Sequence, residues 1–368
     1  MTGPTTRPPL ADITVVDFSE LLPGPFFTQA LAEMGARVIK IERPPHGDNA
    51  RRLGAGGFSA VNRGKESLLV DMKDEAQRAQ VRQLVASADI VVESYRPGVM
   101  ARLGMDFASL QADCPRLIYV SLSGYGQSGP WANLPGHDIN DLAAAGVLAV
   151  SGEAGGPPAL GVGLPVADLC GAMYALSSTL AALFQRESTG QGQHLDVALA
   201  DCALHWMNPR LGTYRESGAA TVEAQREVTL VKPAYGAFAC LDGRYLSIAA
   251  LEDHFWQRLC QAIDLAPFNG EVYQSFKQRK PHAQAINQRI AEAVKDRDAD
   301  ALFELLSRHD VPVAPVVEPA RLAALPQFAT RDKFEAGDHM PLVRFPVPLA
   351  GMSEGVLGPV PALGSARI

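Results

Sequence analysis

Strand-like and helix-like patterns alternate along the first two hundred residues, and this alternation limits the chain to very few folds. Apolar runs at Ile13–Phe18 and Val38–Glu42 predict buried strands, and Pro25–Met34 between them predicts a helix. The same order recurs in four further segments: a strand at 67–71, a helix at 74–88, and strands at 90–93 and 116–121. Strands joined by helices at this spacing form parallel sheets with right-handed crossovers. The sequence therefore predicts an α/β fold with a doubly wound, mostly parallel sheet.

The alternation continues to about residue 207. A long helix is predicted from Asp168 to about Arg186, followed by a strand at His194–Val197 and a helix at 198–207. The next stretch, 210–233, is polar and irregular in pattern. We therefore expect a linker there that leaves the first domain.

A smaller α/β unit is expected after the linker. The Asp242-Gly243 turn separates two strand-like runs at 234–240 and 245–250, which is a hairpin signal. Helices are expected at 252–263, 284–294 and 298–308, and a strand at 311–317. Seven prolines between positions 319 and 361 prevent a long helix in the tail, so we expect an extended return. The predicted organisation is a large domain at 1–215, a linker at 216–232, a small domain at 233–317, and a segment at 318–368 that packs on the large domain.

Composition and charge exclude several classes of protein. The formal net charge of -7 argues against wrapping nucleic acid by bulk charge. None of the five cysteines forms a C-x-x-C pair, which argues against a zinc site or a disulfide framework. The first residues lack a secretory signal pattern, and the most apolar stretch, 171–184, is shorter than the roughly 20 residues of a bilayer span. We expect a cytoplasmic protein that binds neither a metal, nor nucleic acid, nor a membrane.

A glycine-rich segment follows the strand predicted at 116–121. Gly124, Gly126 and Gly129 spell G-x-G-x-x-G, the pattern of a dinucleotide site when a helix opens directly after it. Pro130 and Trp131 follow instead, which favours a loop. Such a loop, Tyr125 included, brings backbone N–H groups close to a ligand oxygen with few side chains in the way.

Basic residues gather between positions 37 and 66, where seven basic side chains face three acidic ones, a local charge of +4. The basic residues are Arg37, Lys40, Arg43, Arg51, Arg52, Arg63 and Lys65. One interpretation is an ordinary solvated face, and the other is a pocket for a phosphorylated ligand. Arg96 and Arg102 follow the end of another strand and join the same region in the second interpretation. Ligands of open α/β sheets bind beyond the carboxyl ends of the strands, where Lys40, Arg43 and Arg96 would lie.

Three residues at predicted helix starts are candidates for acid–base chemistry. His137 precedes an apolar helix, Asp168 opens the long helix, and Glu252 opens a helix of the small domain. Each has a structural alternative, because carboxylates at helix starts cap the helix or complement its dipole, and Asp138 is a simple N-cap in the same interpretation. The functional interpretation makes Asp168 a base or a nucleophile. Taken singly, none of the three is decisive.

Long ordered segments resemble the family III CoA-transferases (CaiB/BaiF-like), a group that also contains the α-methylacyl-CoA racemases. The resemblance spans about Pro9 to Gly364. The segments that carry it are VVDFSELLPGPFFTQALAEMGARVIKIERP, NRGKESLLVDMK, ESYRPGVMARLG, RLIYVSLSGYGQSGP, PGHDIN, LPVADLCG and RESTGQGQHLDVAL.

The resemblance implies a Rossmann-like large domain, a smaller second domain, and an interlocked homodimer that acts on acyl-CoA thioesters. It implies that Lys40, Arg63, Arg96 and Arg102 hold the phosphates and adenine of coenzyme A. No cofactor is implied beyond coenzyme A as part of the substrate. Asp168 matches the family's catalytic aspartate, which in transferases attacks the thioester and gives an anhydride and then an aspartyl-CoA thioester.

The racemase branch implies different chemistry at the same residues. There His137 and Asp168 flank the α-carbon of a 2-methylacyl-CoA and exchange its proton through an enolate, and Glu252 matches a glutamate that supports the histidine. His137 and Glu252 favour this branch, since transferases more often have tyrosine at the histidine position.

Other features depart from the racemases, among them Leu169–Gly171 in place of a glycine run and Asp141 in place of a common tyrosine. Val231–Pro233 also replaces the Gly-Gly pair that often precedes the second-domain strand. The sequence therefore predicts α-proton transfer first, CoA transfer as the alternative, and a non-catalytic acyl-CoA binder as the weaker alternative.

Overall fold

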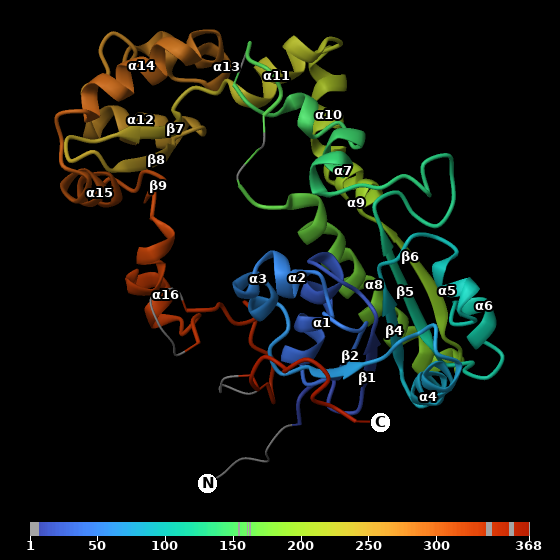
Figure 1. Cartoon of the computed structure of the whole chain (residues 1–368). Coiled ribbons are helices and arrows are strands. Elements are labelled where there is room, and N and C mark those ends of the chain that lie inside the picture. The colour runs from blue at the N-terminus through green and yellow to red at the C-terminus, as the bar shows by residue number, and fades with distance from the viewer. Residues whose placement is uncertain are drawn as a thin grey trace. The chain divides into compact units, whose positions relative to one another are not determined.

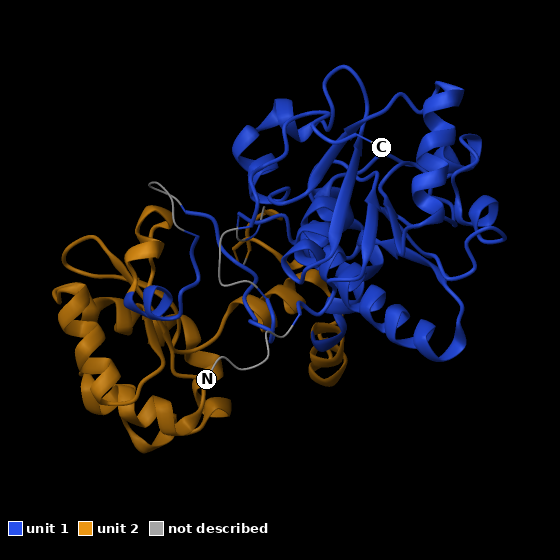
Figure 2. Cartoon of the chain, turned by 90° about the horizontal axis from the view of Figure 1, so that it is seen from below, with its two compact units in different colours: residues 1–149, 160–209, 326–368 blue, residues 150–159, 210–325 orange. Residues whose placement is uncertain are grey.

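The chain forms two compact units, which Figure 2 colours blue and orange. Unit 1 comprises residues 1–149, 160–209 and 326–368, and unit 2 comprises 150–159 and 210–325. The computed structural model describes residues 7–153, 155–159, 161, 163–335, 341–352 and 357–367. Parts of the expected return segment 318–368 lie outside these residues.

Unit 1 is built on a six-stranded parallel sheet with the strand order β3-β2-β1-β4-β5-β6 (Figure 1). The strands are β1 (Thr14–Asp17), β2 (Arg37–Glu42), β3 (Glu66–Leu69), β4 (Ile90–Glu93), β5 (Ile118–Ser123) and β6 (Gln193–Ala198). The predicted doubly wound parallel sheet is confirmed. The order reverses between β1 and β4, and ligands of such sheets bind beyond the carboxyl ends of the strands at this switch point.

Helices cover both faces of this sheet. Helices α1 (Pro23–Glu33) and α8 (Val166–Thr189) share one core with the sheet, and α4 (Glu75–Ala86), α5 (Val99–Arg102) and α6 (Phe107–Leu110) share the other. Val15 packs into the first core and Val16 into the second, because successive side chains of a strand point to opposite faces. Burial on both faces explains why these strands read as continuous apolar runs.

Helix α8 corrects one expectation. It runs for 24 residues, so by length and composition it passes the test for a membrane span, and the expectation that this stretch is too short for one is wrong. Cys170, Ala172, Ala175 and Leu176 of the helix are buried in the core that it shares with α1 and the sheet. Packing within unit 1 therefore accounts for this apolar face, while Met173 and Phe184 of the same helix are exposed.

The other helices of unit 1 lie in the connections. They are α2 (Ala50–Leu53), α3 (Ala55–Ala60), α7 (Asp138–Ala144), α9 (Leu199–Trp206) and α16 (Pro326–Thr330). Helices α7, α8 and α9 share a small apolar core of Leu142, Ala145, Ala167 and Ala203. This core joins the end of α7 to the first turn of α8.

Unit 2 contains a three-stranded antiparallel sheet of β7 (Tyr235–Ala239), β8 (Tyr245–Ala249) and β9 (Val313–Pro315). The hairpin predicted around Asp242-Gly243 joins β7 to β8. Helices α12 (Asp253–Ala262), α14 (Ala283–Val294) and α15 (Ala299–Arg308) pack on this sheet around Trp256, Ile286 and Leu302. The remaining short helices are α13 (Phe276–Arg279) and 3₁₀ turns at Glu271–Tyr273, Lys280–His282 and Pro319–Ala324, with another at Leu148–Val150.

The expected irregular linker is helical, and that prediction is wrong. Residues 208–230 form α10 (Asn208–Ser217) and α11 (Val222–Leu230), and the hydroxyl of Thr221 caps α11 by accepting the Ala224 N–H at 3.2 Å. The buried Arg226 of α11 donates to the carbonyl oxygens of Ser151, Gly156 and Pro157. A buried arginine that gathers carbonyls from residues 150–159 leaves no periodic signal, so the sequence reads as a polar linker.

The described parts of the tail contact unit 1. The Phe345 N–H donates to Glu33 of α1 at 2.5 Å, and Arg51 donates to the Pro361 carbonyl oxygen at 3.1 Å. The N–H groups of Gly364 and Ala366 donate to the hydroxyl and the carbonyl oxygen of Ser67. The first and last parts of the chain therefore build one unit.

Candidate functional site

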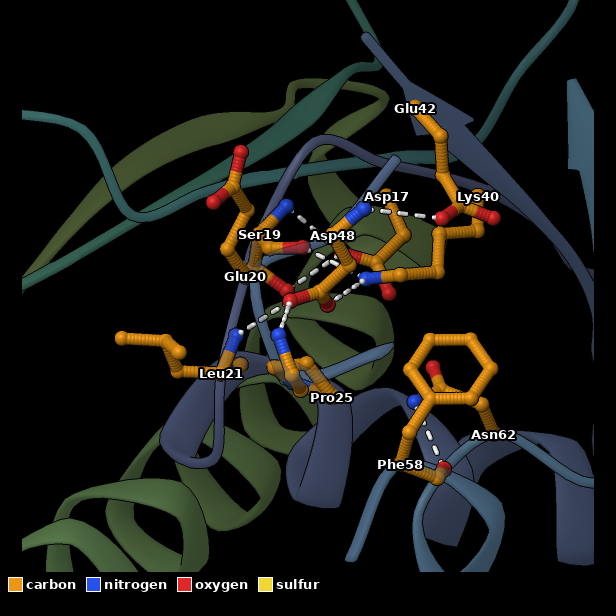
Figure 3. A network of polar contacts seen from close by, with 12 residues as sticks. Asp17, Ser19, Glu20, Leu21, Pro25, Lys40, Glu42, Asp48, Phe58 and Asn62 are labelled. Atoms are coloured by element: carbon orange, nitrogen blue, oxygen red, sulfur yellow. Dashed lines mark hydrogen bonds and ion pairs between the residues drawn. The ribbon is translucent and has the colours of Figure 1, made fainter. Parts of the chain in front are cut away.

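A buried ionic network supports the switch point of the sheet (Figure 3). Asp17, the last residue of β1, accepts hydrogen bonds from Ser19 N–H (2.9 Å), Ser19 Oγ (2.5 Å) and Thr28 Oγ1 (2.6 Å). Lys65 Nζ lies 3.4 Å from Asp17, and the side chains of both residues are fully buried. Burial alone raises the pKa of Asp17, but the charges of Lys40 and Lys65 and the hydrogen bonds outweigh it and hold that pKa below its usual range.

The network contains one of the predicted phosphate ligands. Lys40 Nζ lies 2.9 Å from Asp48 Oδ2 and donates to the Ser19 carbonyl oxygen at 2.6 Å, with both charged side chains fully buried. Asp48 Oδ1 in turn accepts the Leu21 N–H at 3.0 Å. Lys40 thus holds the loop between β1 and α1 through the Ser19 carbonyl oxygen. A contact of Lys40 with coenzyme A stays a prediction.

Arg63 is also engaged inside unit 1. Its guanidinium lies 3.1 Å from Glu335 and 3.5 Å from Glu33, and it donates to the Ala60 carbonyl oxygen at 2.7 Å. The residue is buried, and its two ion pairs join Glu335 to Glu33 of α1. Its predicted role in holding coenzyme A is not tested by these contacts.

The other three predicted cations are exposed. Arg43 follows β2 and donates to Asn49 Oδ1 at 3.0 Å, while Arg96 follows β4 and Arg102 ends α5. Arg96 and Arg102 have no ion pair in the described part of the chain. The Glu20 N–H donates to Ser94 Oγ at 3.0 Å and so joins the loop after β1 to the end of β4. Among the described residues, Arg96 therefore lies as an unpaired cation after β4, whereas Arg43 after β2 also lies 3.4 Å from Glu20.

Helix α1 begins with Pro23, Gly24 and Pro25. Proline has no N–H, so two of the first three residues of this helix offer no backbone donor. A dinucleotide site relies on such donors at the first helix of the sheet. This switch point therefore lacks two of the backbone donors that a dinucleotide site uses, and the binding of an anionic ligand by its side-chain cations stays a prediction.

The glycine-rich segment forms a loop after β5, as expected. Gly126 and Gly129 have φ angles of +82° and +93°, which residues with a Cβ rarely adopt. The ring of Tyr125 packs edge-to-face on Trp131 with the centroids 5.5 Å apart. Beside this loop lies a cavity of about 230 Å³, whose apolar lining includes Tyr125, Trp131, Ala145 and Leu204.

Two helix starts meet beside this loop. Asp138, the first residue of α7, accepts the N–H groups of Ala167 (2.6 Å) and Asp168 (3.2 Å) at the start of α8. Asp138 was expected to cap its own helix, and it caps the neighbouring one instead. His137, at the N-cap position of α7, is exposed and donates its N–H to Asn140 Oδ1 at 3.0 Å. The cap by Asp138 thus brings His137 and Asp168 into one region of unit 1.

Asp168 has the properties of a reactive carboxyl group. It is half-buried in the first turn of α8, and none of its carboxyl oxygens takes part in a hydrogen bond within the described residues. Burial, and then the charge of Asp138, raise the pKa of Asp168 to about 7. A carboxyl group with free oxygens and a pKa near neutrality serves as a base or a nucleophile.

Asp141 is a member of this cluster that sequence reasoning missed. It is 1% exposed, and neither of its carboxyl oxygens has a hydrogen-bond partner. Burial, followed by the charges of Asp168 and Asp138, raises its pKa to about 7. In the sequence it stood out only as a departure from the racemases. Its spacing of four from Ala145, which faces the core, is the signal that reveals an inward-facing carboxyl group.

Glu252 belongs to the other unit. It occupies the N-cap position of α12 in unit 2, is exposed, and makes no side-chain capping bond. His137 and Asp168 belong to unit 1. The support of His137 by Glu252 therefore stays a prediction.

Comparison with known proteins gives the context for this site. The model of CoA-transferase family III matches residues 10–367. An acetyl-CoA:oxalate CoA-transferase from Acetobacter aceti is 33% identical over 353 residues, which cover 94% of this chain and 90% of that protein. A human α-methylacyl-CoA racemase is 35% identical over 256 residues, covering 70% of this chain and 65% of the racemase. The other curated relatives of similar identity mostly bear the names of CoA-transferases.

The fold is also found among solved structures. A crystal structure of a CaiB/BaiF family protein from Brucella suis superposes with a TM-score of 0.85 at 30% identity. The superposition covers 98% of this chain and 97% of that one. The likeness therefore includes both units and the segment that carries Asp168.

Proposed function

Because the chain belongs to CoA-transferase family III, we propose that it transfers coenzyme A between carboxylic acids, with Asp168 as the nucleophile. The observation that carries this proposal is the free, half-buried carboxyl group of Asp168 at the start of α8, beside the glycine loop. The names of the most similar full-length relatives support transfer over racemisation, the reaction that the sequence alone favours.

The proposed reaction uses Asp168 twice. Its carboxylate attacks the carbonyl carbon of the acyl-CoA, the C–S bond breaks, and CoA thiolate departs. An acyl-aspartyl anhydride remains. The thiolate then attacks the Asp168 carbonyl carbon, which releases the first carboxylate and leaves aspartyl-CoA. The acceptor carboxylate then attacks the carbonyl carbon of aspartyl-CoA and displaces CoA thiolate, which gives a second anhydride. The thiolate attacks the acceptor's carbonyl carbon in this anhydride, so that the new acyl-CoA departs and the Asp168 carboxylate is restored. Backbone N–H groups of the 124–129 loop would stabilise the oxyanions.

Coenzyme A enters this scheme as part of the substrate. Arg43, Arg96 and Arg102 are the exposed cations that would hold its phosphates, with Lys40 and Arg63 fixing the segments around them. The acyl group would enter the apolar cavity beside Tyr125 and Trp131. The homodimer implied by the resemblance is part of the same proposal.

A second function is favoured by one further observation, the histidine beside Asp168. If His137 and Asp168 exchange the α-proton of a 2-methylacyl-CoA, one group removes the proton and the other returns one on the opposite face. A carboxyl group with a pKa near 7 and a histidine suit this task at neutral pH. The racemase relative supports this branch.

One experiment separates the two functions. The protein is incubated in deuterated water with 2-methylacyl-CoA esters, with and without free dicarboxylic acids, and thioester masses are followed. CoA transfer gives new CoA esters only when free acid is present, with an adduct on the Asp168 peptide. Proton transfer gives deuterium at the α-carbon without acid, and His137→Ala abolishes it while the exposed His282→Ala control keeps it. If ester binds and neither product forms, the protein is a non-catalytic binder.

Arg96 and Arg102 give a separate prediction about coenzyme A. Replacing both with alanine is expected to weaken CoA binding by about tenfold or more, because each charge-assisted phosphate contact contributes about 1.5–3 kcal/mol. Calorimetric titration with CoA measures the affinity, which in the wild type should fall with added salt. The control is Arg7→Ala with Arg116→Ala, two exposed arginines of the same unit. An unchanged affinity in the Arg96/Arg102 variant means that the phosphates bind elsewhere.

A further inference from the structure

Unit 1 contains a second cavity, which the proposed transfer leaves largely unused. It has a volume of about 210 Å³ and lies between the strands β4, β5 and β6 and the helices α5 and α6 (Figure 1). Tyr119 and His194 line it from the strands, and Met100 and Phe107 line it from the helices. The described residues of its lining do not include the candidate catalytic cluster around Asp168. The cavity is therefore a separate place in which a ligand can bind.

Two polar atoms of this lining have no hydrogen-bond partner in the described part of the chain. They are the hydroxyl oxygen of Tyr119 and the side-chain amide nitrogen of Gln127, and both atoms are buried. Tyr119 as a whole is 2% exposed, and its ring packs edge-to-face on His194 with the centroids 5.5 Å apart. Buried polar groups in folded proteins nearly always have a partner. Two unpaired groups in one lining therefore indicate an occupant that accepts hydrogen bonds from them.

The neutral and acidic groups beside these two already have partners. Ser121 Oγ lies 3.0 Å from His194 Nε2, and Glu93 accepts a backbone N–H at 2.8 Å. Asp106 accepts a hydrogen bond from the hydroxyl of Ser109. Burial raises the pKa of Glu93 to about 7, so this carboxyl group carries little charge below neutral pH. The groups that lack a partner are therefore donors.

A cation lies where the cavity meets the solvent. Arg96 belongs to the lining, is exposed, and makes no ion pair within the described residues. Gly98 belongs to the lining as well, and a Cβ added to it would lie 3.5 Å from a guanidinium nitrogen of Arg102. Guanidinium groups bind carboxylates through charge-assisted hydrogen bonds. A ligand of this cavity is therefore expected to carry its negative charge at Arg96 and a neutral oxygen at the buried donors.

We propose that the cavity binds a small monocarboxylic acid that also bears a hydroxyl or keto oxygen. Its carboxylate lies at Arg96, and its second oxygen accepts hydrogen bonds from Tyr119 and Gln127. The volume is below the roughly 300–1,000 Å³ of cavities for drug-sized ligands, which limits the acid to a few carbon atoms. The carboxyl groups of Glu93 and Asp106 disfavour a second carboxylate nearby and are able to accept a ligand's hydroxyl. Binding of this acid does not depend on the proposed CoA transfer.

Gln127 links this cavity to the loop beside Asp168. The loop at 124–129 contributes Tyr125 to the first cavity and Gln127 to the second. The Gln127 N–H donates to Asp196 at 3.0 Å, so the backbone of the loop is already held there. An acid bound to the side chain of Gln127 adds a further contact, and hydrogen exchange of the loop amides should slow on binding. Slowing in other segments only would contradict this placement.

Titration calorimetry of the full chain with small acids tests the proposal, and its failure leaves CoA transfer untouched because no CoA ester is present. The probes are glycerate, lactate and pyruvate, while propionate lacks the second oxygen and glycerol lacks the carboxylate. At least one probe is expected to bind about tenfold or more tightly than propionate, because propionate leaves Tyr119 and Gln127 unpaired. Glycerol should bind more weakly than that probe, since it offers no charge to Arg96. Equal affinities for the probes and propionate would overturn the proposal. The absence of any binding would do the same, since the cavity then holds only water.

Two variants test whether the acid lies in this cavity. Tyr119→Phe removes the unpaired hydroxyl and keeps the ring, so the fold is expected to persist, and Gln127→Leu removes the amide at similar size. Each should lower the affinity for the best probe by about tenfold and leave that for propionate unchanged. Tyr235→Phe, which alters an exposed tyrosine of unit 2, is the control and should match the wild type. Arg96 stays intact in these variants, because it is also predicted to hold coenzyme A. An unchanged affinity in both variants means that the acid binds elsewhere, for instance beside Asp168, and the proposal is then wrong.

Discussion

Asp168→Asn is expected to lower the rate of CoA transfer by about 10⁴-fold or more, the scale seen when an enzyme loses its nucleophile. The amide cannot form an anhydride or a thioester, so the adduct on the Asp168 peptide should vanish as well. In the wild type, adduct formation should increase as the pH rises through about 7, because the raised pKa of Asp168 keeps part of it protonated below that value. Rapid-quench kinetics with mass detection of the adduct measures both effects.

A first control is that Asp168→Asn still binds its substrate. Binding of CoA should stay within a few-fold of the wild type, because the exposed arginines that would hold the phosphates are unchanged. Asp113→Asn, an exposed carboxylate elsewhere in unit 1, should keep full turnover. Turnover within tenfold of wild type in Asp168→Asn would refute both the transfer and the proton-transfer mechanism, since each uses this carboxyl group.

The second large effect concerns stability and the network under the switch point. Asp17→Ala is expected to destabilise unit 1 by about 3–5 kcal/mol, because Lys65 loses its anion and Lys40 a neighbouring negative charge in a fully buried place. The hydroxyl of Ser19 also loses its acceptor, and the hydroxyl of Thr28 loses its contact at 2.6 Å and keeps only the longer ones to the Gly24 and Pro25 carbonyl oxygens. Hydrogen exchange of amides in β1 and β2, or chemical unfolding, measures the loss.

Acid provides a second readout of the same network. The pKa of Asp17 is lowered in the folded state, so its stabilising contribution is present above the ordinary value of 3.8 and is lost as the pH falls through the lowered one. The Asp17→Ala variant should therefore approach the wild type in stability only under strongly acidic conditions. The exposed Asp12→Ala, which loses a surface pair with Arg7, should change stability by less than about 1 kcal/mol. A loss below about 1 kcal/mol in Asp17→Ala would show that the network is dispensable.

The fold was predictable because its pattern is local. Buried parallel strands read as short apolar runs and the helices between them have their own period, so β1, β2, β4 and α8 were located from the sequence. Helices α10 and α11 were not, because α11 is held through Arg226 by carbonyl groups of a distant segment, and α10 contacts α11 through the Tyr214–Thr229 hydrogen bond.

The sequence named most of the candidate residues, whose roles stay predictions, but it did not predict how they are arranged. Counting charges identified Lys40 and Arg63 as cations, yet it gave no sign that Asp48 and Glu335 would bury them in ion pairs. Asp168 was a candidate because it opens a predicted helix, and the resemblance then gave it the role of the catalytic aspartate. The cap that Asp138 places on α8 depends on the meeting of two helices, which no local pattern encodes.

The return of the tail to unit 1 has a consequence for how the protein acquires its structure. Glu33 receives a hydrogen bond from Phe345, 312 positions later, and Arg51 binds the carbonyl of Pro361. During synthesis these contacts of unit 1 form only after the tail has left the ribosome. Nearly all of unit 2 is contiguous in sequence and leaves the ribosome before the tail. Pairings of such long range slow folding, since the intervening chain must be ordered before they contribute. Unit 2 is therefore expected to be native first, with completion of unit 1 as the last event.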